Sequence, residues 1–158
     1  MPKIDIATAP VRRGSGYPAP FRDAVSARVA HRLGDAAGLT HFGVNLVRIP
    51  PGAWSSQRHW HTHEDEFVWV VEGELVMVTD AGEQVMRAGD CAGFPAGDGD
   101  GHHFQNRSGA DAVILAVGNR SAADACDYPG IDLKTIPDDQ NPDDRSPFVH
   151  RDGTPYEP

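Results

Sequence analysis

The chain has few cysteines and lacks any long apolar segment. Its 158 residues include two cysteines, Cys91 and Cys126. A disulfide scaffold would need more, so we expect both to be free thiols in a reducing compartment. No apolar run approaches the roughly 18 residues that a membrane span requires. No apolar stretch follows a basic start, as it would in a signal peptide. These absences favour a cytoplasmic protein.

Basic residues are also scarce relative to acidic ones. The 14 lysines and arginines face 23 aspartates and glutamates, which gives a formal net charge of −9. Nucleic acids and anionic membranes bind basic surfaces, so we expect neither as a partner. A small anionic substrate stays possible, because a bound metal supplies local positive charge. The sequence also lacks a nucleophile motif, a glycine-rich phosphate loop and a helix-turn-helix, and it identifies no general acid or base.

Glycine (17) and proline (13) are plentiful, which favours tight turns and short strands over long helices. We divide the chain into an N-terminal arm with a leading strand (1–39), a barrel (40–118) and a Pro- and Asp-rich tail (119–158). Residues 21–33 fit either a helical stripe or an alternating strand. Because residues 34–38 are typical of a turn, we favour a hairpin with a strand over 40–49.

Short strands at regular spacing follow. They are expected at 66–71, 75–79, 83–86, 91–94, 102–106 and 111–117, with a last short piece at 148–150. This spacing predicts an all-β sandwich or barrel. The tail has too little apolar content to fold alone.

Three histidines and a glutamate form the strongest chemical signal. His59 and His61 are two residues apart, so in a strand their side chains share a face. Glu66 follows them, and His102 lies in a later predicted strand. Two neighbouring strands could aim all four groups into one cavity. This mixed nitrogen and oxygen donor set suits one divalent metal ion, namely Fe, Mn, Ni, Co or Zn.

Two further histidines compete for places in this site. His63 offers a rival set with His61 and Glu66. His103 stands beside His102, but by strand alternation it would point outward or toward a neighbouring subunit. The sequence favours His59 and His102 over these two rivals without eliminating them.

The spacing of these residues resembles the two motifs of the cupin superfamily. The first is carried by Gly52, His59, His61, Glu66 and Gly73, and the second by Gly89, Pro95, Gly97, His102 and Asn106. Gly52 is one residue further upstream than usual, and four residues instead of two separate Gly97 from His102. The resemblance covers residues 40–118. It implies a small double-stranded β-helix, or jelly-roll barrel, like that of short bacterial cupins sometimes labelled sugar-phosphate-isomerase-like.

The resemblance also implies a site and a function. His59, His61, Glu66 and His102 would hold the metal and leave coordination positions open for water or substrate. Such a protein would be a metal-dependent enzyme acting on a small carbonyl, carboxylate or sugar-like compound, by isomerase, dioxygenase or lyase chemistry. The alternative is a non-catalytic small-molecule or sugar-binding cupin. Asn106 would be a structural hydrogen-bonding residue.

Apolar side chains would surround the metal in the barrel. Val68, Val70, Phe104 and Leu115 are expected in this interior, whereas Trp69 should face away from it by alternation from Glu66. A barrel of this size has open sheet edges, which the Pro-rich arms of a partner could cover. We therefore expect a homodimer.

Overall fold

The fold is almost entirely β. The computed structural model describes residues 3–141 and 146–156. Its strands are β1 (Val11–Arg13), β2 (Val29–Arg32), β3 (Phe42–Ile49), β4 (Trp60–His61), β5 (Glu66–Glu72), β6 (Glu74–Thr79), β7 (Gly82–Arg87), β8 (Cys91–Phe94), β9 (His103–Gln105), β10 (Ala112–Asn119), β11 (Cys126–Asp127), β12 (Lys134–Thr135) and β13 (Phe148–Val149). The helical turns are η1 (Ile6–Thr8), η2 (Ala19–Phe21), η3 (Asp23–Val25), α1 (Leu33–Ala36) and η4 (Asp138–Gln140). None of these described helices is long and apolar enough to cross a membrane.

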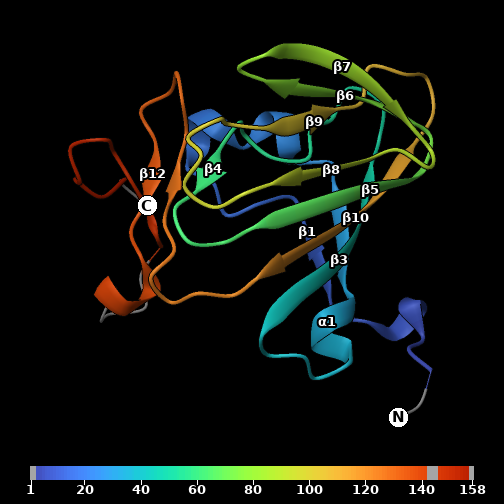
Figure 1. Cartoon of the computed structure of the whole chain (residues 1–158), viewed down its shortest axis with the longest axis horizontal. Helices are drawn as coiled ribbons and strands as arrows, with labels where there is room; N and C mark the ends of the chain where they lie inside the picture. The colour runs from blue at the N-terminus through green and yellow to red at the C-terminus, as the bar shows by residue number, and fades with distance from the viewer. Residues whose placement is uncertain (1–2, 142–145, 157–158) are drawn as a thin grey trace.

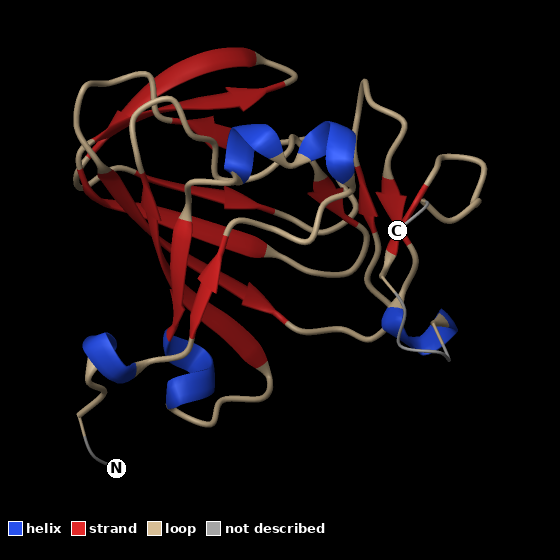
Figure 2. Cartoon of the chain, turned by 180° about the vertical axis from the view of Figure 1, so that it is seen from behind, coloured by secondary structure: helices blue, strands red, loops and turns tan. Residues whose placement is uncertain are grey.

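The strands of the described residues gather into three sheets. In the described part of the chain, a six-stranded sheet has the order β1-β2-β3-β10-β5-β8, and a three-stranded sheet has the order β7-β6-β9. These two sheets face each other as the walls of the barrel, and β4 joins β11, β12 and β13 in a further sheet at one end (Figure 1). The helical turns are short, and all except η1 lie between strands along the chain (Figure 2). The all-β jelly-roll prediction is confirmed.

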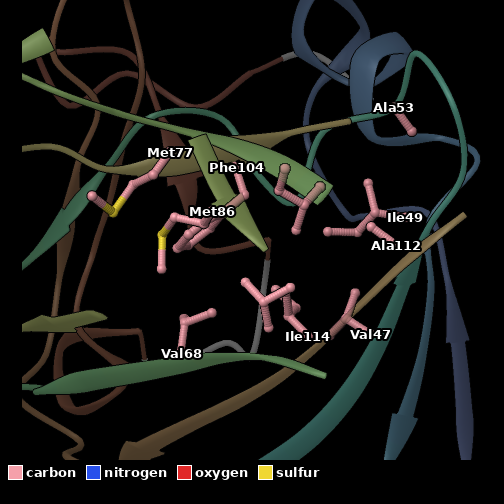
Figure 3. Close-up of a cluster of buried hydrophobic side chains, with 11 residues drawn as sticks. Val47, Ile49, Ala53, Val68, Met77, Met86, Phe104, Ala112 and Ile114 are labelled. Carbon is pink, nitrogen blue, oxygen red and sulfur yellow. The ribbon is translucent and has the colours of Figure 1, made fainter. Parts of the chain in front are cut away.

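The main core lies between the two walls. Val47, Val68 and Ile114 point inward from the six-stranded sheet, and Met77 and Phe104 meet them from the other wall (Figure 3). Alternation along each strand puts the next residue on the outer face, so the core is a single layer of interdigitated side chains. Burying these groups supplies most of the driving force for closing the barrel.

The predicted strands agree well with the observed ones. The favoured hairpin is confirmed: β2 and β3 pair antiparallel, with His31 opposite Leu46, although the turn between them contains the short helix α1. One predicted interior residue was wrong. Leu115 lies opposite Trp69, and the exposure of Trp69 puts both on the outer face of the sheet.

The terminal segments share a second apolar core. Its buried members are Tyr17, Val25, Tyr128 and Leu133. Tyr17 and Tyr128 meet edge to face, with ring centroids 5.7 Å apart. The tail thus gains from the N-terminal segment the apolar partners that it lacks alone. Residues 142–145 of the Pro- and Asp-rich tail lie outside the described residues.

Candidate metal centre

The four predicted ligands lie together at one end of the barrel. They line a cavity of about 500 Å³. His61 belongs to β4 and Glu66 begins β5. His59 and His102 pair through two backbone hydrogen bonds of 3.2 and 2.9 Å, which fix both residues at the cavity wall. The longer spacing before His102 therefore leaves it in place beside the other three.

Three of these residues form a compact donor set. The ligand atoms of His59, His61 and Glu66 all lie within 4.8 Å of one another. His102 is linked to the set through Glu66, because its Nε2 lies 2.9 Å from the Glu66 Oε2 atom. The His102 ring also stacks on Phe94 at a centroid distance of 3.5 Å. The arrangement gathers nitrogen and carboxylate donors around one point.

Hydrogen bonds orient two of the imidazoles. The Nδ1 atom of His59 lies 2.8 Å from the Gln57 carbonyl oxygen, and that of His61 lies 2.7 Å from the Asp124 carboxylate. A carbonyl oxygen or a carboxylate can only accept, so both Nδ1 atoms carry the hydrogen. The Nε2 atom of each ring is then left as the potential metal ligand. The buried Nδ1 atom of His102 has no hydrogen-bond partner among the described residues.

Burial and charge set the protonation of this set. Burial lowers the pKa of His59 to about 4, so its imidazole is neutral at neutral pH. Burial opposes ionisation of Glu66, but the hydrogen bond from His102 and the charges of the surrounding imidazoles outweigh it and lower the pKa to about 2. A neutral imidazole and an ionised carboxylate are the forms that bind metal ions.

The tail supplies two residues that sequence reasoning missed. Asp124 and Cys126 form a second compact group with His61, and the Cys126 Sγ atom lies 3.4 Å from the His61 Nδ1 atom. Burial opposes the charged form of His61, yet Cys126 and Asp124 raise its pKa to about 10. A metal ion must therefore compete with a proton at this ring. Neither residue belongs to a local motif, so the sequence carried no signal for them.

The two rival histidines lie elsewhere. His63 is exposed, and its Nδ1 atom lies 2.8 Å from the Thr62 hydroxyl. His103 does not line the cavity of the donor set, as strand alternation predicts, but it is buried and only 4% exposed instead of facing solvent. The loop before β4 covers it: its Nδ1 atom lies 3.1 Å from the Ser56 carbonyl oxygen, and its ring packs against Trp54.

Asn106 is a structural hydrogen-bonding residue. Its side-chain amide donates to the Ile49 and Ala110 carbonyl oxygens at 2.7 and 2.8 Å. Its side-chain oxygen accepts from the backbone N–H of Ser108 at 2.9 Å. These contacts hold the turn that leads into β10.

The cavity also has polar groups beyond the donor set. Tyr17 and Tyr128 line it as well as packing in the second core. Burial raises the pKa of both phenols, so they stay protonated and can donate hydrogen bonds. Glu64, which resembles a solvated turn residue in the sequence, is half-buried in the same wall.

The residues present fit a divalent metal ion. The compact donor set combines two imidazoles with an ionised carboxylate, and the hydrogen-bonded Nδ1 atoms leave the opposite nitrogens available. Such a set suits a first-row transition metal or zinc. His102 would complete it from its place beside Glu66.

Comparison with known proteins identifies the family. Residues 45–118 match the Cupin domain model. A crystal structure from Silicibacter pomeroyi, described as a sugar phosphate isomerase from a cupin superfamily, shares 46% identity with a TM-score of 0.88, over 99% of this chain and 97% of that one. A candidate sugar phosphate isomerase from Acidithiobacillus ferrooxidans shares 29% identity with a TM-score of 0.71, over 83% and 81% of the two chains.

More distant similarity extends to the fold alone. A Thermotoga maritima structure, described as a predicted oxalate decarboxylase, is 20% identical with a TM-score of 0.61, over 75% of this chain and 99% of that one. No curated protein matches the chain. Because the Silicibacter protein matches over nearly the full length of both chains, and the domain model covers the barrel that holds the donor set, this chain belongs to the cupin superfamily.

Proposed function

We propose that this protein is a metal-dependent enzyme that acts on a small carbonyl, carboxylate or sugar-like compound. The observation that carries the proposal is the compact set of His59, His61 and Glu66 ligand atoms, all within 4.8 Å of one another at the cavity wall. His102 is the fourth proposed ligand. Fe, Mn, Ni, Co and Zn are the candidate ions.

The cavity suits a small oxygen-bearing ligand. Its volume of about 500 Å³ lies within the usual range for small-molecule sites. A divalent ion held there would polarise a carbonyl or hydroxyl oxygen and lower the pKa of a bound water. The phenols of Tyr17 and Tyr128 can donate hydrogen bonds to further ligand oxygens. Phe104 and Val68 form an apolar floor.

Isomerisation of a sugar phosphate is the reaction to test first. The two relatives with the highest structural similarity given above are described by that activity. An isomerase of this kind moves a proton between neighbouring carbons while the substrate oxygens stay bound, and a polarising cation beside protonated phenols would favour it. Dioxygenase and lyase reactions are the other reaction classes to test.

The proposal is tested by metal content and turnover on the same samples. Untagged wild-type protein and a His59→Ala, His61→Ala double variant are measured by plasma mass spectrometry. Each is then incubated with phosphorylated and unphosphorylated aldoses and ketoses, and products are followed by NMR. We expect near one metal ion per wild-type chain, and loss of both metal and turnover in the folded double variant.

A His63→Ala variant is the matched control, because His63 is exposed and does not line the cavity. It should retain metal and turnover. Wild-type protein without metal, even after reconstitution, would overturn the proposal. Bound metal and saturable sugar binding without any product would instead support a non-catalytic binding cupin.

A further inference from the structure

Two arginines of the N-terminal segment lie at the open edge of the six-stranded sheet. Arg12 in β1 pairs with Ala30 in β2, and Ala30 pairs with Val47 in β3. Paired residues share a face, and Val47 is buried in the barrel core, so Arg12 emerges on the inner face. Arg28, two residues before Ala30, lines the same cavity as Arg12.

Arg28 is a partly buried cation that forms no ion pair with an acidic side chain in the described part of the chain. Its Nε–H donates to the Gly14 carbonyl oxygen at 3.0 Å, and its Nη1 atom donates to the Ser55 carbonyl oxygen. Burial lowers the pKa of Arg28, and the nearby charge of Arg12 lowers it further. Carbonyl oxygens satisfy two of its donors. Tyr17, Tyr128 and Glu66 oppose the lowering of the pKa, but none of them forms an ion pair with the guanidinium in the described part of the chain.

Arg12 is free to bind a ligand. Its guanidinium makes no hydrogen bond or ion pair within residues 3–141 and 146–156. It lies over the chain at Gly16, since a Cβ atom there would be 3.3 Å from its Nη2 atom. By contrast, Arg32 and Arg120 in the same cavity wall both pair with Asp35, at 2.7 and 2.6 Å.

We propose that Arg12 and Arg28 form an oxyanion subsite that binds the phosphate or carboxylate group of the ligand. Planar guanidinium groups match the geometry of both anions and bind them with two parallel hydrogen bonds. One anion between the two side chains would relieve their mutual repulsion. Anion binding by the two arginines does not depend on the proposed function. The inference rests on that function only where it assumes that the rest of the ligand extends toward the donor set of His61 and Glu66.

This subsite narrows the substrate class. The whole chain carries a formal charge of −9, so two cavity arginines that form no ion pair within the described residues are a local exception. It favours a small compound with an anionic group at one end and a carbonyl or hydroxyl oxygen at the other. Neutral sugars would leave Arg12 without an ion-pair partner.

The test uses inorganic phosphate and acetate as probes on the full chain. Each is titrated at constant ionic strength, and the dissociation constant is read from the NMR signals of the arginine Nε–H groups. We expect Arg12→Gln to weaken phosphate binding by about tenfold or more, because a charge-assisted hydrogen-bond pair is lost. The stronger of the two probes identifies the group that the subsite prefers.

The matched control is Arg13→Gln, which removes the same charge from the opposite face of the same exposed strand. It should bind phosphate as wild type does. A metal-free His61→Ala variant should also retain phosphate binding, so failure of the metal site and failure of the arginine subsite give different results. Unchanged binding in Arg12→Gln, or no phosphate or acetate binding to wild type, would overturn the inference.

Discussion

The carboxylate of Asp124 accepts a hydrogen bond from the His61 Nδ1 atom at 2.7 Å, although the two residues are 63 positions apart in the sequence. The carboxylate is itself held in place, because its other oxygen accepts from the backbone N–H of His63 at 2.8 Å. The tail therefore fixes the orientation of a proposed metal ligand on the barrel. This relationship makes the tail part of the site.

Asp124→Asn should weaken metal binding. An asparagine keeps the size of the side chain but removes the charge that favours an Nδ1–H tautomer of His61, and losses of about 10- to 100-fold are typical for such partners. The metal dissociation constant is measured by competition with a chromophoric chelator. Asp138→Asn is the control for charge, because Asp138 is exposed in η4. Equal affinities in Asp124→Asn and wild type would show that His61 needs no orientation by the tail.

Metal should stabilise the folded protein through Glu66. A ligand present at 100 times its dissociation constant stabilises the native state by about 2.7 kcal/mol. Melting curves with the metal and with excess chelator should therefore differ for wild type and coincide for Glu66→Gln, which loses the ionised carboxylate. Glu72→Gln, at the exposed end of the same strand, should behave as wild type. Equal wild-type melting temperatures with the metal and with excess chelator would contradict the proposed ligand set.

The barrel could be predicted because its signals are local. Alternating strands and turn residues repeat at short intervals, and the His59 and His61 pair lies on one short segment, so period-two geometry was enough to place it. The two motifs together located Glu66 and His102 on neighbouring walls. Leu115 was misplaced because an apolar strand has no polar alternation to show which face is buried.

The rest depended on long-range packing. Asp124 and Arg12 lie in segments that the sequence marks as a tail and an arm, and Arg28 lies in the leading strand segment, where no motif distinguishes it. Their positions follow from the sheet pairing of β1 with β2 and of β11 with β4. The burial of His103 could not be predicted for a related reason: strand alternation gives the face of the residue, but a covering loop decides whether that face meets solvent.

The homodimer expected from the sequence stays a prediction. Substitutions on the outer face of β5 would test it. Phe67, Trp69 and Val71 are 43, 48 and 49% exposed there, and contiguous apolar surface of this kind often marks an interface. Wild type should have the mass of two chains by light scattering, and Trp69→Arg that of one. Val85→Arg, equally exposed on β7, is the control. A monomeric wild type would contradict the prediction.

Alanine substitutions at Gly52 and Gly73, two glycines of the first motif, should distinguish the cost of backbone strain from the cost of steric overlap. Both glycines have a left-handed backbone, with φ of +80° and +81°. A Cβ atom at Gly73 would lie 2.7 Å from the Asp111 carbonyl oxygen, whereas one at Gly52 would meet nothing within 4 Å. Gly52→Ala should cost about 1–2 kcal/mol of unfolding free energy from strain alone. Gly73→Ala should cost about 1–3 kcal/mol more, because β10 must shift. Urea unfolding measures the unfolding free energy of both variants. Equal losses of free energy would show that β10 shifts away from the added Cβ atom at no cost.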